Sequence, residues 1–140
     1  MRDLRAMNQQ IIEKFRAGAD MGGMPRDRML LLTTTGRRSG LPRTAPMMFT
    51  RVNGTLVVVA SNSGAARDPD WYRNLVADPA VTVEIGDEHF AATARPAKDP
   101  ERAAVWASVI GQIPMYVQHQ QSTKREIPLV ELIADTPHAE

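Results

Sequence analysis

The sequence predicts a mostly antiparallel β-barrel with helices at its rim, which is an α+β protein that is mainly β. Three observations predict it. Strand-like runs outnumber helix-like runs, no regular helical crossovers join them, and Asn53-Gly54 is the strongest two-residue hairpin signal. The 140 residues suffice for one domain with its own core. We divide the chain into an N-terminal helix with its linker (1–25), a barrel domain (26–134) and a tail (135–140).

The first predicted element is an amphipathic helix over residues 4–17, which Gly18 ends. Its apolar residues recur at helical spacing: Leu4, Met7, Ile11, Ile12 and Phe15. In one interpretation this apolar stripe packs on the rest of the domain. In the other it contacts a membrane surface or a large apolar substrate, because basic residues beside an apolar face suit anionic lipid.

The predicted strands are either continuous apolar, β-branched runs or segments that alternate apolar and polar residues. They cover residues 29–35, 44–52, 55–60, 81–85, 88–95 and 127–133. Further helices are expected at 68–78, 101–110 and 114–120. In Asp68-Pro69 and Asp99-Pro100, Asp is placed to cap the helix and Pro to occupy its first position.

Composition and missing motifs exclude several classes of function. Lys+Arg 17 against Asp+Glu 16 leaves a net charge of +1, which argues against nucleic acid as a partner. No cysteine is present, so we expect a cytoplasmic protein without thiolate chemistry. The three histidines are scattered and no acidic pair has ligand spacing, so we expect no metal site. No apolar run approaches the roughly 20 residues of a membrane span. Without a phosphate-loop or hydrolase motif, the chemistry is expected to come from a cofactor.

Three local features suggest binding. The loop Gly36-Arg37-Arg38-Ser39-Gly40, with Arg43 after it, combines backbone freedom with guanidinium groups that pair with phosphate or carboxylate. The alternative is a solvated turn. The small polar run 60–65 follows a strand, where backbone amides can face a planar heterocycle. Residues 70–74 put aromatic and polar groups on the first turns of a helix, although Trp71 also suits core packing.

Together these stretches closely resemble the mycobacterial-type deazaflavin-dependent nitroreductases. The resemblance spans roughly residues 28–133, and its motifs occur in the same order. They are 32–40, Pro42-Arg43, Ala60-Ser61, 69–75, 77–79, 93–95, 99–102 and 114–116. The resemblance implies a split β-barrel, like the flavin mononucleotide (FMN)-binding barrels, that binds coenzyme F420. This coenzyme is an 8-hydroxy-5-deazaflavin with a phosphate and an oligoglutamate tail.

The resemblance also implies roles for individual residues. The phosphate and tail would be held by Arg37, Arg38, Ser39, Gly40 and Arg43. Met47 and Met48 would lie along the ring, which would meet backbone groups of Val59, Ala60, Ser61 and Asn62. The tail side would be closed by Asp70, Trp71, Tyr72, Arg73 and Asn74. The catalytic candidates are Tyr116, to hydrogen-bond or protonate the substrate, and Ser61.

The function implied is hydride transfer from reduced F420 to a small or apolar electrophile: a quinone, an enone or unsaturated lactone, or a nitroaromatic. Ile113 and His119 stand where better-known nitroreductase relatives carry tyrosines, which disfavours bulky bicyclic nitro compounds. His119 is either a surface residue or a proton donor near neutral pH. The alternatives are an FMN-dependent split-barrel oxidoreductase and a non-catalytic protein that binds the deazaflavin or a lipophilic ligand. The oligomeric state is left open.

Overall fold

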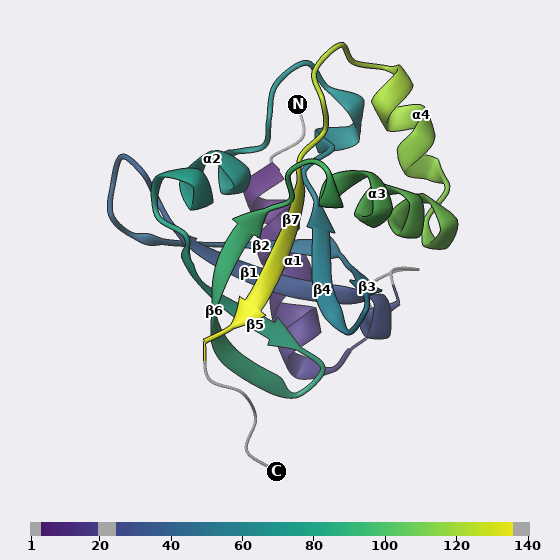
Figure 1. The fold of residues 1–140 in the computed structure, drawn as a ribbon. Helices are drawn as coiled ribbons and strands as arrows, with labels where there is room; N and C mark the ends of the chain where they lie inside the picture. The colour runs from purple at the N-terminus through teal and green to yellow at the C-terminus, as the bar shows by residue number, and fades with distance from the viewer. Residues whose placement is uncertain (1–3, 20–24, 136–140) are drawn as a thin grey trace.

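A computed structural model describes residues 4–19 and 25–135, so most of the predicted linker and tail lies outside it. Within this range a curled, fully antiparallel sheet runs in the order β2-β1-β5-β6-β7-β4-β3 (Figure 1). Its strands are β1 (Met29–Thr35), β2 (Pro42–Met48), β3 (Thr50–Val52), β4 (Thr55–Val59), β5 (Ala80–Ile85), β6 (Glu88–Pro96) and β7 (Leu129–Ala134). The predicted antiparallel barrel is confirmed.

The helices flank this sheet. They are α1 (Leu4–Ala17), α2 (Asp70–Ala77), α3 (Glu101–Gln112) and α4 (Met115–Gln121), with short 3-10 turns η1 (Arg26–Arg28) and η2 (Asn62–Gly64). Figure 1 shows α2, α3 and α4 around the upper and right-hand rim, with α1 behind β1 and β2. Most observed ends lie within two residues of the predicted ones. In the described part of the chain, no helix has the length and apolarity that a bilayer crossing requires.

The strand predicted over 44–52 is wrong in one respect, because it is two strands that meet at Phe49. β2 pairs with β1 at one edge of the sheet, and β3 pairs with β4 at the other. The Phe49 amide leaves the ladder and donates to the Arg28 carbonyl at 3.2 Å. One chain segment therefore joins both edges and closes the barrel. The change of partner depends on that closure and has no local signature, since the whole segment reads as β-prone.

The core explains why β1 is apolar along its length. Leu30 and Leu32 point into the barrel, where they pack against residues such as Val58 and Val83. Met29 and Leu31 point to the opposite face and pack against α1, because successive side chains of a strand alternate. Ile12 and Phe15 supply the α1 side of that contact and are only 5% and 2% exposed. The helix is therefore packed on the barrel, as the first interpretation expected.

Candidate functional site

The predicted arginine loop lies against α2. The Arg37 guanidinium donates to Asn74 Oδ1 at 2.8 Å and to Asp70 Oδ1 at 3.3 Å. The Arg37 backbone amide reaches the same Asn74 oxygen at 3.2 Å. Buried Asn74 in turn donates to Thr34 Oγ1 at 3.2 Å. Three predicted site residues, Arg37, Asp70 and Asn74, are thus brought together, and their bonds make the loop and helix one unit.

The rest of the loop presents positive charge to solvent. Arg38 and Arg43 are exposed, and within the described residues neither guanidinium group forms an ion pair or a hydrogen bond. Ser39 Oγ accepts from the Leu41 amide at 3.1 Å, and Gly40 has a φ of +72°, so the turn suits these residues. Unpaired guanidinium groups on an ordered turn fit a ligand that carries phosphate and carboxylates. The donor set is therefore compatible with the tail of F420.

A second group of predicted residues lies where β4 ends. Ser61 is buried, and its Oγ lies 3.0 Å from His119 Nδ1 on α4. The His119 ring packs edge-on against the Tyr116 ring, with 5.6 Å between centroids. Burial raises the pKa of the Tyr116 phenol, because the charged phenolate is poorly solvated there. The two catalytic candidates, Ser61 and Tyr116, are therefore joined through His119, and the phenol keeps its proton at neutral pH.

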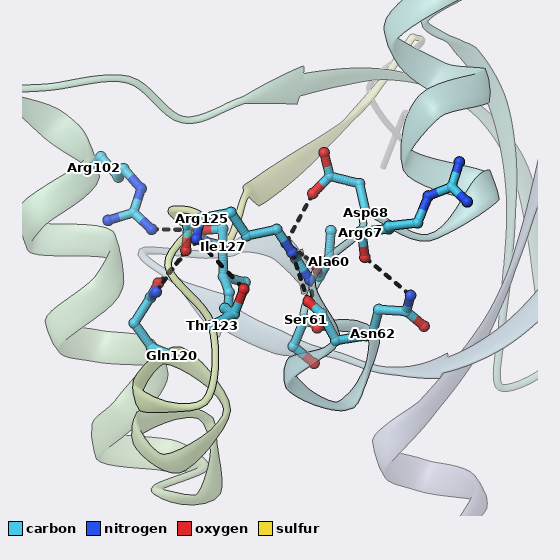
Figure 2. A network of polar contacts seen from close by, with 11 residues as sticks. Ala60, Ser61, Asn62, Arg67, Asp68, Arg102, Gln120, Thr123, Arg125 and Ile127 are labelled. Carbon is cyan, nitrogen blue, oxygen red and sulfur yellow. Dashed lines mark hydrogen bonds and ion pairs between the residues drawn. The ribbon is translucent and has the colours of Figure 1, made fainter.

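The same turn depends on Arg125, which sequence reasoning missed (Figure 2). Its guanidinium donates to the carbonyls of Ala60 at 3.1 Å, Ser61 at 2.6 Å and Ala65 at 2.9 Å. It also pairs with Asp68 Oδ1 at 2.8 Å. The expectation that Asp68 and Asp99 cap helices is wrong, since α2 begins at Asp70 and α3 at Glu101 without a side-chain cap. Asp68 binds Arg125 instead. Arg125 lies in an irregular segment with no periodicity, so only the tertiary contacts reveal it.

The remaining predicted residues are divided between faces. Met47 packs against the barrel core and Met48 against the α1 cluster, so the structure does not place them side by side on one face. Met48 lines a cavity of about 420 Å³ with Phe49 and Ile113. Arg28, Arg51 and Gln112 are among its polar lining residues.

Aromatic residues of α2 lie partly in the core. Trp71 and Tyr72 are half-buried and pack against the barrel cluster. Burial, followed by the charge of Asp68, raises the pKa of Tyr72.

Val59 and Arg73 are half-buried, whereas Asn62 is exposed and has a φ of +49°. Asn62 Nδ2 donates to the Arg67 carbonyl at 3.0 Å, which closes the turn after β4. No group of three metal-ligating side chains occurs in the part of the chain that the structure describes.

Comparison with known proteins identifies the family. The sequence model of the F420H(2)-dependent quinone reductases matches residues 4–133. An F420H(2)-dependent quinone reductase of Mycobacterium tuberculosis (strain ATCC 25618 / H37Rv) is 39% identical over 106 residues, which are 74% of this chain and 71% of that protein.

Solved structures agree. One of an F420-H2 dependent reductase, FDR-A, is 37% identical with a TM-score of 0.68, and the match covers 75% of this chain and 93% of that one. Another, a domain-swapped dimer, is 34% identical with a TM-score of 0.71 and coverages of 92% and 96%. The predicted family, split-barrel fold and coenzyme are confirmed. The chain belongs to the F420H(2)-dependent quinone reductase family, whose hydride donor is reduced coenzyme F420.

Proposed function

We propose that this chain reduces a small, apolar quinone with hydride from reduced F420, at the rim formed by the arginine loop, α2, the end of β4 and α4. The observation that carries the proposal is that one stretch of chain, residues 60–74, connects the two groups of site residues, the arginine loop with α2 and the end of β4 with α4. Arg37 bonds the loop to α2, and Ser61 bonds the end of β4 to α4. Cations for an anionic tail and a proton donor for a substrate therefore belong to the same rim.

The two exposed cations, Arg38 and Arg43, are the residues proposed to bind the phosphate and the carboxylates of the tail. Hydrogen bonds between charged groups contribute about 1.5–3 kcal/mol each. Arg37 has a different part in this proposal: its bonds to Asn74 and Asp70 hold the loop in shape, while 22% of its side chain stays exposed. Ser39, Gly40 and Arg73 complete the tail side.

The chain's own residues must supply a proton and exclude water. Reduction of a quinone to a hydroquinone takes one hydride and one proton, and bound F420 in its reduced form supplies the hydride. Tyr116 carries its phenolic proton at neutral pH, and burial raises its pKa further, so it is the proposed donor to the quinone oxygen. The hydrogen bond between His119 and Ser61 fixes the Ser61 hydroxyl next to the His119 ring. The cavity beside Met48, Phe49 and Ile113 has apolar and polar lining residues, and Ile113 at the end of α3 connects it to the segment that leads into α4.

A cytoplasmic location and membrane contact through residues 4–17 stay predictions. Ile12 and Phe15 are buried against the barrel and cannot face lipid at the same time. Contact with a membrane surface would use the exposed part of α1, where Met7, near the N-terminal end of the same apolar stripe, is 40% exposed.

The test is turnover of a panel of quinones, enones and nitroaromatics with reduced F420, and separately with reduced FMN. We expect menadione to be reduced with F420 and not with FMN.

Coenzyme affinity should fall by several kcal/mol in the double variant Arg38→Ala/Arg43→Ala, since each lost charged bond costs about 1.5–3 kcal/mol. Arg95→Ala is the matched control, because Arg95 is an exposed arginine (66%) that pairs with Glu131 on another face. Equal affinities of the two variants would remove the loop from the site, and binding without turnover would indicate a carrier.

A further inference from the structure

Arg125 makes more contacts with the turn after β4 than its place in an irregular segment suggests. We propose that Arg125 is a positioning residue of the coenzyme site, which fixes the direction in which the backbone N–H groups of Ser61 and Asn62 point. This inference rests on the proposed function, because it takes the turn after β4 as the place where the ring of F420 meets the protein.

The argument starts from the geometry of the peptide bond. In a planar trans peptide the carbonyl and the next N–H point in opposite directions. Arg125 binds the carbonyls of Ala60 and Ser61, at 3.1 and 2.6 Å, and so draws both toward itself. The N–H groups of Ser61 and Asn62 must then point away from Arg125. Among the described residues neither amide donates to a protein acceptor, so both remain available to a ligand.

The contact also joins the two groups of site residues. Besides the turn carbonyls, the guanidinium pairs with Asp68, two residues before α2 begins. The Arg125 and Asp68 side chains are 15% and 33% exposed, so this charge pair is partly shielded from water. One planar group therefore sets the end of β4, η2 and the start of α2 relative to each other. A lysine at this position has no forked guanidinium with which to reach them all.

Gln120 holds Arg125 from the other side (Figure 2). Its Nε2 donates to the Arg125 carbonyl at 2.8 Å, and its Oε1 accepts from the Ile127 amide at 2.9 Å. The backbone that carries the guanidinium is thus fixed to α4, the helix that also carries Tyr116 and His119. Movement of the turn relative to these side chains requires these bonds to break.

A neighbouring arginine provides the matched control. Arg102 is equally buried (12% exposed), donates to the Ile127 carbonyl at 2.6 Å and pairs with Glu126. It stabilises the same segment of chain, but the hydrogen bond, ion pair and ring contact that it forms in the described part of the chain all go to residues outside the turn at 60–68. If Arg125 served stability alone, replacing either arginine would have the same consequences.

The experiment compares Arg125→Gln, Arg125→Lys and Arg102→Gln in the full chain. Thermal melting checks folding, coenzyme fluorescence gives the dissociation constant for F420, and hydrogen exchange with mass spectrometry follows the amides of residues 60–68. We expect Arg125→Gln to weaken coenzyme binding by at least about tenfold, because the turn carbonyls lose their charged partner and the Ser61 and Asn62 amides are no longer held in the direction of the ligand. Exchange over 60–68 should become faster in Arg125→Gln and be partly restored in Arg125→Lys. Arg102→Gln should lower the melting temperature without either change.

The outcomes separate this proposal from the function on which it rests. A folded Arg125→Gln protein with wild-type coenzyme affinity, or with exchange over 60–68 no faster than in Arg102→Gln, overturns the positioning role. If Arg125→Gln does not fold, Arg125→Lys and Asp68→Asn take its place, each keeping part of the contact. Absence of F420 binding by the wild-type chain would overturn the proposed function instead.

Discussion

At the scale of single residues, Tyr116 holds the proton on which the proposed reaction depends. Its side chain is 6% exposed, and burial moves its pKa above the ordinary value of 10.0. The neutral phenol is therefore the form present at neutral and mildly alkaline pH, and any loss of rate from ionisation of Tyr116 should come at a higher pH than for an ordinary phenol. The Tyr116 ring contacts His119, and His119 is hydrogen-bonded to Ser61. Displacement of one of these three side chains is therefore expected to displace the other two.

Tyr116→Phe removes this proton and little else. We expect the rate of quinone reduction at saturating coenzyme to fall by about 100- to 10,000-fold, the usual contribution of a positioned general acid. Coenzyme affinity and the melting temperature should change little, because the phenyl ring still fills its place in the core. Steady-state kinetics with menadione measures the rate, and fluorescence measures the affinity. A variant that keeps the wild-type rate would show that the proton comes from another group, with His119 and Ser61 the first to test.

At the scale of elements, the position of α4 against η2 depends on a glycine. Gly64 has a φ of +78°, and a Cβ at this position would lie 3.0 Å from the His119 carbonyl oxygen and 3.0 Å from Ser122 Cβ. Gly86 also has a positive φ, +57°, but a Cβ there would meet nothing within 4 Å. These two glycines have the same backbone requirement in different surroundings.

The pair Gly64→Ala and Gly86→Ala separates strain from contact. Each substitution places an L residue in the left-handed region, at a cost of roughly 1–2 kcal/mol. Gly64→Ala must in addition displace α4, and overpacking of this kind costs about 1–3 kcal/mol more. We expect denaturant unfolding to show the larger loss for Gly64→Ala, and quinone reduction to fall only in that variant because the Ser61–His119 bond lengthens. Equal losses of stability with unchanged turnover in both would contradict this role for Gly64.

Elements with local signatures could be predicted from the sequence, and elements set by tertiary closure could not. Strand β1, the turn at Asn53-Gly54 and helix α3 follow from apolar runs, turn chemistry and helical spacing that lie within a few residues. The break at Phe49 follows from the pairing of one segment with both edges of the sheet, which no local pattern records.

The candidate site divides in the same way. The resemblance covers contiguous motifs such as the arginine loop, so its residues could be predicted. Arg125 acts on residues 57 to 65 positions away, with neither periodicity nor a motif to mark it. The bond of Arg37 to Asn74 likewise joins two predicted motifs. The spacing of the residues in the sequence does not reveal that these motifs are in contact.

At the scale of the whole molecule, α1 is attached to the barrel in several ways. Arg16 donates to both carboxylate oxygens of Glu84 on β5, at 2.9 and 2.8 Å, and this bond lowers the pKa of Glu84. Arg26 lies over the Phe15 ring at 4.7 Å and donates to the Phe15 carbonyl at 2.8 Å. The boundary predicted near residue 25 stays a prediction, but these contacts lead us to expect that helix and barrel unfold as one cooperative unit.

Phe15→Ala tests this expectation, with Met7→Ala on the same helix as its control. Phe15 is 2% exposed against β1, so truncation leaves a cavity and should lower the free energy of unfolding by about 3–5 kcal/mol. Met7 is 40% exposed, and its truncation should stay within about 0.5 kcal/mol. The tryptophans lie in α2 and α3, so their fluorescence reports on the barrel with its rim helices, whereas circular dichroism also reports on α1. If helix and barrel unfold as one unit, denaturant unfolding followed by the two methods should give coincident single transitions. An early transition seen by circular dichroism alone, or equal effects of the two variants, would mean that the helix detaches independently and is free for another surface.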